Sequence, residues 1–253
     1  MLILLPPSET KRDGGEGMPL DLSALSFPEL TALRAELVER VVALAADAEA
    51  MMRRLRLGPR LAFEVERNRT LRTSPTRPAV DRYTGVLFDA LDAGSLDAPS
   101  RSFAARTLVV HSALFGLVGA LDAVPAYRLS HDSRLAGLPL RRHWQGSIAE
   151  RLADREGLIV DLRSEGYADL GPAPARTNSV FVRVVAEDAD GRRRALNHFN
   201  KQAKGRFARA LLESKTELDT VGELIDWAST AGFALELSRS RSGDVPRELE
   251  LVA

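Results

Sequence analysis

The sequence predicts an α+β fold, a single domain over residues 1–253 with a mixed central sheet flanked by helices. Short apolar runs at residues 1–5, 107–111 and 158–162 have the length and composition of buried strands. Between them lie stretches whose apolar residues recur three and four positions apart, as on one face of a helix. Strands and helices follow one another irregularly, which favours α+β over a regular series of βαβ units.

In the N-terminal half, a strand at residues 1–5 ends at Pro6 and Pro7. A long helix is predicted for residues 29–54, with Arg34 on its outer side. Its apolar face consists of Leu30, Leu33, Leu37, Val41 and Leu44. A short helix at residues 60–70, a proline-bearing loop at 72–82 and a short helix at 83–91 are expected to follow.

In the C-terminal half, a buried strand at residues 107–111 leads into a glycine-containing strand-to-turn segment that ends at Asp122. The remaining predicted elements are a helix at 144–154, a strand at 158–162, a hairpin of 180–185 with 194–199, helices at 200–213 and 219–231, a strand at 233–237 and a last edge strand at 249–252. The hairpin turn is expected at residues 188–191, since the run Asp-Ala-Asp-Gly is a strong turn signal.

The junction at Leu57, Gly58 and Pro59 has two interpretations. It resembles half of a helix-hairpin-helix element, in which backbone amides hold a nucleic-acid phosphate, and Gly58 and Arg60 would then contact DNA. It also fits an ordinary helix end in which glycine stops one helix and proline begins the next. Both interpretations stay open on the sequence alone.

Composition excludes several classes of function. The formal net charge is zero, so an electrostatic partner would have to meet a local patch. There is no cysteine, and the four histidines are scattered singly, so neither a metal site nor a cofactor is predicted. The N-terminal apolar run lacks the features of a signal peptide, and no apolar stretch reaches the ~20 residues of a membrane span. We therefore expect a cytoplasmic protein that does not bind membranes.

A basic segment lies between Gly191 and Leu212, where seven Arg and Lys residues occur without an acidic residue. On a helical wheel, one arc is apolar and the opposite arc carries the predicted DNA-contacting side chains Lys201, Lys204, Arg206 and Arg209. Such a cationic face can bind phosphates with release of counterions. The alternative is a solvated helix surface, which is what most charge runs are.

Polar residues follow several predicted strands, at the sheet edge where pockets form in α/β architectures. The predicted pocket consists of Ser8, Lys11, Tyr83, Ser112, Tyr127, Arg128, Ser164, Glu165 and Tyr167. They could line one site for a small anionic or nucleotide ligand, with Lys11 and Glu165 as candidate acid–base groups, or they could be separate caps and turns. Ser8 and Lys11 have the Ser-x-x-Lys spacing of penicillin-binding enzymes, but the companion motifs of that family do not occur here.

Several segments together resemble the YaaA family of bacterial peroxide-stress proteins. They include Pro7 to Lys11, Tyr83-Thr84-Gly85, Ser112 to Asp122, Asp161 to Tyr167 and Lys201 to Arg206, in the family's order and along nearly the whole chain. The resemblance implies an α+β fold with a basic cleft, a helix-hairpin-helix-like element and DNA binding. It also implies a role in limiting oxidative damage under peroxide stress, linked to lower free intracellular iron.

Two hypotheses of different class follow. The first is a DNA-binding stress protein without enzymatic activity that recognises the backbone and the shape of double-stranded DNA, distorted DNA included. The second is an enzyme that acts on a nucleotide, a nucleobase or damaged nucleic acid in the strand-end pocket. A direct iron-binding protein is disfavoured by the lack of cysteine and of clustered histidines.

Overall fold

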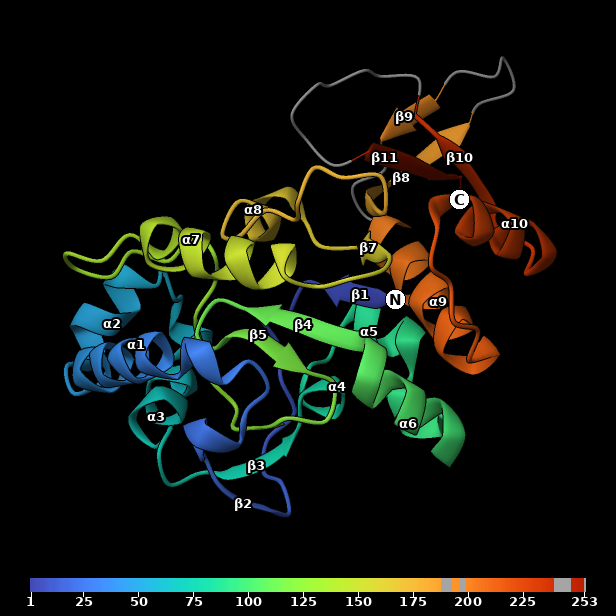
Figure 1. Ribbon diagram of the computed structural model, residues 1–253. Helices are drawn as coiled ribbons and strands as arrows, with labels where there is room; N and C mark the ends of the chain where they lie inside the picture. Colours follow the sequence, from blue (N-terminus) through green and yellow to red (C-terminus); the bar gives the residue numbers. More distant parts are fainter. Residues whose placement is uncertain (188–192, 196–198, 239–246, 253) are drawn as a thin grey trace.

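A mixed sheet forms the centre of the computed structural model, which describes residues 1–187, 193–195, 199–238 and 247–252. The strand order is β10-β11-β8-β7-β1-β4-β5, with β9 paired to β8 (Figure 1). The strands are β1 (Leu2–Leu5), β4 (Leu108–Ser112), β5 (Gly116–Gly119), β7 (Ile159–Asp161), β8 (Ser179–Glu187), β9 (Arg193–Ala195), β10 (Ala234–Leu237) and β11 (Arg247–Val252). The central pairs from β11 to β4 are parallel, and β5, β9 and β10 are antiparallel to their partners. The predicted α+β fold with a mixed central sheet is confirmed.

Helices cover this sheet, with α7 and α8 above the central strands and α5 and α6 below them in the view of Figure 1. Their bounds are α1 (Thr31–Ala45), α2 (Ala48–Arg54), α3 (Phe63–Arg69), α4 (Ala79–Arg82), α5 (Val86–Leu91), α6 (Ala98–Thr107), α7 (Leu140–Ala153), α8 (Glu165–Ala168), α9 (Phe199–Ser214) and α10 (Val221–Thr230). A second, small sheet has the order β2-β3-β6, with β2 (Gly17–Pro19), β3 (Pro75–Pro78) and β6 (Ala123–Val124). Short 3-10 turns are η1 (Leu22–Ala24), η2 (Pro28–Leu30), η3 (Pro59–Leu61) and η4 (Ala93–Ser95).

The core lies against β1 and β4, whose residues are all buried. Trp144 of α7 is fully buried, and its indole N–H donates to the carbonyl of Ala113 at 2.9 Å. Gly116 packs directly against this ring: its φ is +64°, and a Cβ there would lie 2.9 Å from Trp144. A side chain at this position would therefore have to displace the indole.

The predicted helix over residues 29–54 is two helices, α1 and α2. Asp47 separates them, because its carboxylate accepts the amide N–H of Ala50 at 2.9 Å and so caps α2. The expected outward position of Arg34 is also wrong. Arg34 is fully buried, and its guanidinium donates to the carbonyls of Phe115, in the turn between β4 and β5, and of Leu117 in β5.

Two further expectations need correction. Residues 72–82 are not a loop: they form β3 and α4, with the two prolines at the ends of the strand, where no ladder hydrogen bond is lost. The last strand is not at the edge, since β11 lies between β10 and β8. The predicted pairing of β8 with β9 is present in the register Val185 to Ala195, and the predicted turn at 188–191 lies outside the described residues.

The described helices include none that is long and apolar enough to cross a membrane.

Candidate functional site

Three parallel strands end at one edge of the sheet. The β1 strand pairs with β4 and with β7, so the segments that follow Leu5, Ser112 and Asp161 leave the sheet on the same side. The amide N–H of Leu162 continues the ladder by donating to the carbonyl of Leu4 at 2.8 Å. We call the polar cluster at this edge, built around Lys11, Tyr83, Ser112 and Tyr127, the strand-end site.

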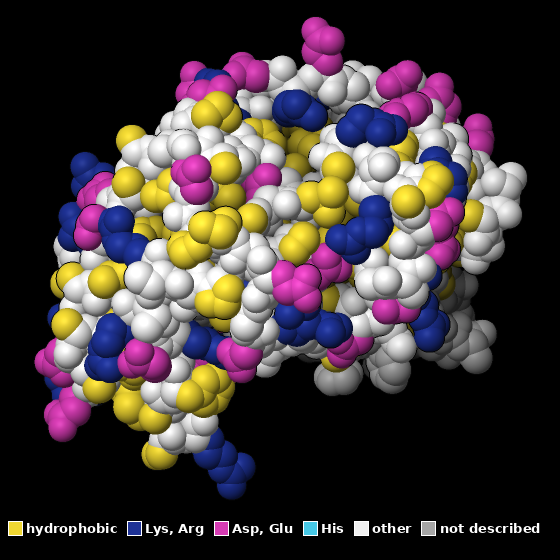
Figure 2. Space-filling view, turned by 90° about the horizontal axis from the view of Figure 1, so that it is seen from below, with side chains coloured by type: hydrophobic (Ala, Val, Ile, Leu, Met, Phe, Trp, Pro, Cys, Tyr) yellow, Lys and Arg dark blue, Asp and Glu magenta, His cyan; other side chains and the backbone are white. Residues whose placement is uncertain are grey.

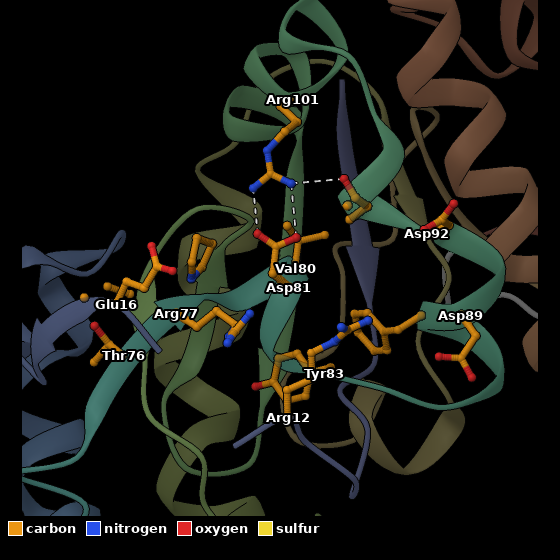
Figure 3. A pocket seen from close by; sticks show the side chains of 16 residues that line it. Arg12, Glu16, Thr76, Arg77, Val80, Asp81, Tyr83, Asp89, Asp92 and Arg101 are labelled. Carbon is orange, nitrogen blue, oxygen red and sulfur yellow. Dashed lines mark hydrogen bonds and ion pairs between the residues drawn. The ribbon is translucent and has the colours of Figure 1, made fainter. Parts of the chain in front are cut away.

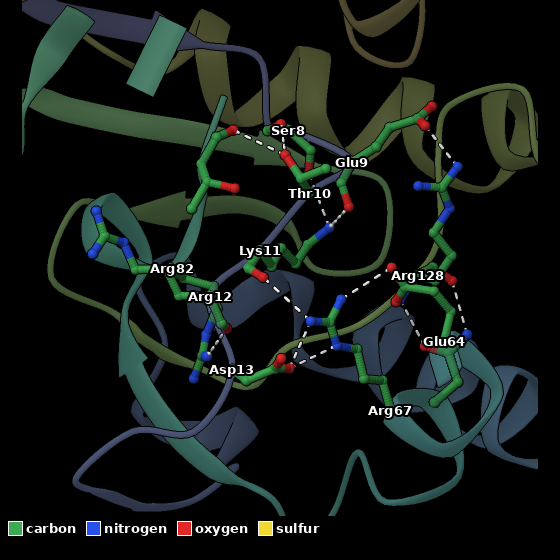
Figure 4. Close-up of polar contacts among 12 residues, drawn as sticks. Ser8, Glu9, Thr10, Lys11, Arg12, Asp13, Glu64, Arg67, Arg82 and Arg128 are labelled. Atoms are coloured by element: carbon green, nitrogen blue, oxygen red, sulfur yellow. Dashed lines mark hydrogen bonds and ion pairs between the residues drawn. The ribbon is translucent and has the colours of Figure 1, made fainter. Parts of the chain in front are cut away.

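Lys11 is buried in the strand-end site, with 6% of its surface exposed. Its Nζ donates to the carbonyls of Ser8 at 2.9 Å and Glu9 at 3.2 Å, so the loop after the double proline folds back over its own lysine (Figure 4). The same Nζ lies 4.1 Å from the ring centroid of Tyr127 and 5.4 Å from that of Tyr83. The loop carbonyls and the two aromatic faces therefore replace water around this ammonium.

Burial lowers the pKa of Lys11 to about 7. The Glu64 carboxylate opposes this shift, while the nearby guanidinium groups of Arg128 and Arg67 add to it. An amine with a pKa near 7 is partly unprotonated at neutral pH, so it can accept a proton or attack an electrophile.

A chain of hydroxyl groups runs beside this lysine. The Oγ of Ser112 accepts the amide N–H groups of Leu114 and Phe115 at 3.1 and 2.9 Å and lies 2.7 Å from the Tyr127 hydroxyl. The Tyr127 hydroxyl is in turn 2.9 Å from that of Tyr83. Because Ser112 uses its lone pairs on the two amides, its O–H donates to Tyr127, and Tyr127 then donates to Tyr83.

The site also contains four residues that the sequence analysis did not predict: Asp13, Glu64, Arg67 and Asn68. Arg67 of α3 donates to Asp13, to Glu64 at 3.0 Å and to the Lys11 carbonyl at 3.3 Å (Figure 4). The Asn68 side chain holds the backbone of Arg128 with two hydrogen bonds. Its Oδ1 accepts the Arg128 amide N–H at 2.7 Å, and its Nδ2 donates to the Arg128 carbonyl at 2.8 Å. The Glu-x-x-Arg spacing of Glu64 and Arg67 on one helix face was the available sequence signal.

Arg128 pairs with a member of the N-terminal loop. Its guanidinium donates to the carboxylate of Glu9 at 2.6 Å, so the predicted pocket residue Arg128 lies at the border of the strand-end site rather than on Lys11 itself. Glu64 is 2% exposed, and its Oε2 has no hydrogen-bond partner among the described residues.

A second buried network lies at the end of β7. Arg163 forms a bidentate ion pair with Asp161 at 2.6 and 2.9 Å, and both side chains are essentially inaccessible. Another N–H of Arg163 donates to Nδ1 of His111 at 2.8 Å. Burial, and then the charge of Arg163, lowers the pKa of His111 well below its usual value, so this imidazole is neutral. The ring of Tyr167 packs edge-on against His111 and His131.

The side chains of Ser8, Ser164 and Glu165, which were also predicted for the pocket, do not contact the Lys11 ammonium. The hydroxyl of Ser8 is 3.2 Å from that of Thr10, and Lys11 contacts the carbonyl of Ser8, not its hydroxyl. Ser164 is exposed before α8, and the exposed Glu165 accepts from Arg183 of β8 at 2.9 Å. The carboxylates that act on Lys11 are Glu64 and Glu9, not Glu165.

The predicted DNA-contacting cations of α9 differ in their surroundings. Lys201 and Arg206 are exposed. Lys204 is not on the outer face as expected: it is 4% exposed, its Nζ donates to the carbonyl of Arg163 at 3.0 Å, and burial lowers its pKa to about 8. Arg209 pairs with Glu213 at 2.8 Å and donates to the carbonyls of Leu91 and Asp92.

The tight packing of α9 explains why one face of this helix is buried. Gly205 lies against α5 so closely that a Cβ would stand 2.2 Å from the carbonyl oxygen of Leu87. At the other predicted DNA contact, Gly58 and Arg60 are exposed between α2 and α3. Figure 1 places α2 and α3 on the opposite side of the molecule from α9.

In the described ranges, no three His, Asp or Glu side chains are grouped so that they could hold a metal ion.

Comparison with known proteins identifies the family. Residues 1–238 match the family described as peroxide stress protein YaaA. The chain belongs to this family. The resemblance carried by the strand-end motifs and the lysines of α9 is thereby confirmed.

Three relatives of similar length resemble this chain along most of its sequence. A UPF0246 protein of Corynebacterium efficiens is 44% identical over 95% of this chain and 97% of its own length. A UPF0246 protein of Streptomyces coelicolor is 41% identical over 100% and 98%. An uncharacterized protein of Campylobacter jejuni is 26% identical over 81% and 82%. The chain therefore spans nearly the full length of the two more similar relatives.

Proposed function

We propose that this protein acts in the response to peroxide by binding double-stranded DNA through the phosphate backbone, without sequence specificity. Membership of the YaaA family supports the stress role. The observation that carries DNA binding is the exposure of Lys201 and Arg206 on α9, neither of which forms an ion pair with another described residue. Free surface cations of this kind can neutralise phosphates and release their counterions.

The proposed contacts are local rather than one continuous band. On the face shown in Figure 2, Lys and Arg side chains are interspersed with Asp and Glu side chains. Arg60 and Gly58 would supply a second contact on the opposite side of the molecule from α9 (Figure 1). Because Lys204 and Arg209 are held by carbonyls and carboxylates, they support the helix more than they offer free charge. Protection of DNA, with the link to lower free iron that the family resemblance implies, completes the proposal.

The salt dependence of duplex binding tests the proposal. In the Lys201→Ala/Arg206→Ala double variant, loss of two phosphate contacts should lower affinity and reduce the slope of log Kobs against log salt by about 1.8. Fluorescence anisotropy with a labelled duplex over a salt series measures both quantities. The control is Arg155→Ala. Arg155 is exposed and lies in the segment before β7, outside α9, so its removal should leave the slope unchanged. An unchanged slope in the double variant would exclude α9 as the DNA contact.

A second candidate function is enzymatic, and the burial of Lys11 favours it. A lysine that is held by two carbonyls over an aromatic ring, with its pKa near 7, is costly to keep in a fold unless its amine is used. In this proposal Lys11 accepts a proton from a bound nucleotide or nucleic-acid substrate, and the Ser112, Tyr127 and Tyr83 hydroxyls relay or donate protons nearby.

Titration of the lysines tests whether Lys11 can serve as this base. The chain has only four lysines, so ¹³C-methyl labelling of the amines gives a small set of NMR signals. We expect the Lys11 signal to titrate near pH 7 and that of Lys204 near pH 8, against about 10.4 for an ordinary lysine. Lys11→Arg and Lys204→Arg assign the signals. A Lys11 signal that titrates above pH 10 would remove the basis for the catalytic proposal.

A further inference from the structure

A cavity of about 740 Å³ lies next to the strand-end site. Its walls come from the N-terminal loop, from β3 and α4, and from the segment 88–94. Of the predicted pocket residues only Tyr83 lines it, so this space is distinct from the filled polar cluster around Lys11. Tyr83 links the two, because its hydroxyl is the last of the chain that begins at Ser112. The volume is within the range of ligand pockets, ~300–1,000 Å³.

The cavity wall carries charges of both signs, three arginines together with the carboxylates of Glu16, Asp81, Asp89 and Asp92. Arg12 and Arg77 line it, and neither guanidinium makes a hydrogen bond or an ion pair with any residue that the structure describes. The side chain of Arg77 extends into the cavity (Figure 3), and its Nε is buried without a partner among the described residues. A ligand oxygen in the cavity would give the terminal N–H groups of these two arginines the acceptors that the described residues do not supply.

Arg82 adds positive charge from behind the wall. It is fully buried and donates to the carbonyls of Val124, Arg12 and Pro75, all of them neutral acceptors. Burial, and then the charge of Arg77, lowers the pKa of Arg82 to about 10. A buried cation is stable only with compensation, and an anion in the cavity would supply it to both groups.

The remaining walls indicate what else the ligand contains. Tyr83 and Phe88 also line the cavity, but they are 2% and 5% exposed, so they form a small apolar border rather than an open stacking face. Carboxylates of Glu16 and Asp89 lie on opposite sides of the view in Figure 3, where they can accept hydrogen bonds from hydroxyl or amino groups. Asp81 is taken by the bidentate pair with Arg101, at 2.6 and 3.1 Å.

We propose that this cavity binds a nucleoside monophosphate, with the phosphate held by Arg12 and Arg77, the sugar hydroxyls or base amino group by Asp89 and Glu16, and the base beside the apolar border formed by Tyr83 and Phe88. The planar fork of arginine matches phosphate oxygens in pairs. A single phosphate fits better than a triphosphate, because the carboxylates on the same walls would repel additional negative charge. The assignment requires neither DNA binding nor catalysis by Lys11.

Isothermal titration of the full chain with adenosine 5′-monophosphate tests the proposal. We expect saturable binding with one site, at least tenfold tighter than that of adenosine, inorganic phosphate or ATP. Arg12→Ala and Arg77→Ala should each weaken binding of the monophosphate at least tenfold. Arg155→Ala removes an exposed arginine elsewhere and should change the affinity less than twofold.

Thermal unfolding of each variant separates loss of binding from loss of the fold. Arg12 is exposed and its side chain makes no contact that the fold needs in the described ranges, so Arg12→Ala remains informative even if Arg77→Ala unfolds. The proposal is overturned by an absence of saturable binding, by phosphate alone binding as tightly as the nucleotide, or by wild-type affinity in Arg12→Ala. Because DNA affinity is not measured here, the outcome is independent of the salt-series test of α9.

Discussion

Replacement of Asp161 by asparagine is expected to lower the free energy of unfolding by about 3–5 kcal/mol. Asp161 is the bidentate partner of the fully buried Arg163, and it also supports the buried ammonium of Lys204 by raising its pKa against the effect of burial. The variant would leave both cations without this counter-charge. Removal of one member of a buried pair costs more than the pair itself contributes, because the remaining charge stays desolvated.

Urea denaturation of Asp161→Asn against the wild type measures this loss. Glu66→Gln is a control, since Glu66 also pairs with an arginine, Arg69, but the two side chains are 60% and 47% exposed. An exposed pair of this kind is worth under about 1 kcal/mol. Equal destabilisation of the two variants would show that the Asp161–Arg163 pair is not the buried support described above.

The strand that leads to Lys11 was predictable, but the surroundings of the lysine were not. Four apolar residues followed by two prolines give a buried strand and a sharp end by local rules alone. Burial of Lys11 depends on Tyr83 and Tyr127, which come from distant parts of the chain, and on Arg67 and Glu64 of α3. Local pattern rules place a lysine outside by default, so only the assembled fold reveals its lowered pKa.

Local pattern rules also failed to predict the positions of Arg34, Lys204 and Arg77. The first two carry a charge where the helical pattern suggests solvent, yet carbonyls at the ends of strands accept their hydrogen bonds in the interior. Arg77 lies between two prolines that indicate a loop, while pairing with Val124 makes the segment a strand. The cavity therefore had no sequence signal, whereas the strand-end cluster did: its residues are short polar groups directly after apolar runs.

The stability of the protein is expected to rise by about 4–5 kcal/mol from pH 7 to pH 9.5 and to fall again at strongly alkaline pH. In the folded state the pKa of Lys11 is about 7 and that of Lys204 about 8, against about 10.4 in the unfolded chain. Between these values the unfolded chain binds more protons than the folded one, so a rise in pH favours the folded state.

The tyrosines produce the opposite slope at higher pH. All three are buried, and burial raises the pKa of Tyr83 to about 12 and raises those of Tyr127 and Tyr167 well above their usual value. Above pH 10 the unfolded chain loses phenolic protons that the folded protein keeps, which favours unfolding. Absorbance at 295 nm should accordingly show little phenolate in the native protein at pH 10.5 and substantial phenolate in urea.

The variant Lys11→Met isolates the contribution of the strand-end site. In this variant the rise in the free energy of unfolding between pH 7 and pH 9.5 should be smaller by more than half. The variant should also compare better with the wild type at pH 6 than at pH 9.5, because at pH 6 the wild type carries a buried ammonium that the variant lacks. Lys201→Met, at an exposed position of α9, should keep the wild-type profile. If Lys11→Met also keeps that profile, the Lys11 ammonium is not desolvated in solution. If the profile flattens, the fold carries at neutral pH a charge that weakens it, and such a cost is typical of a group kept for the chemistry or binding of its site.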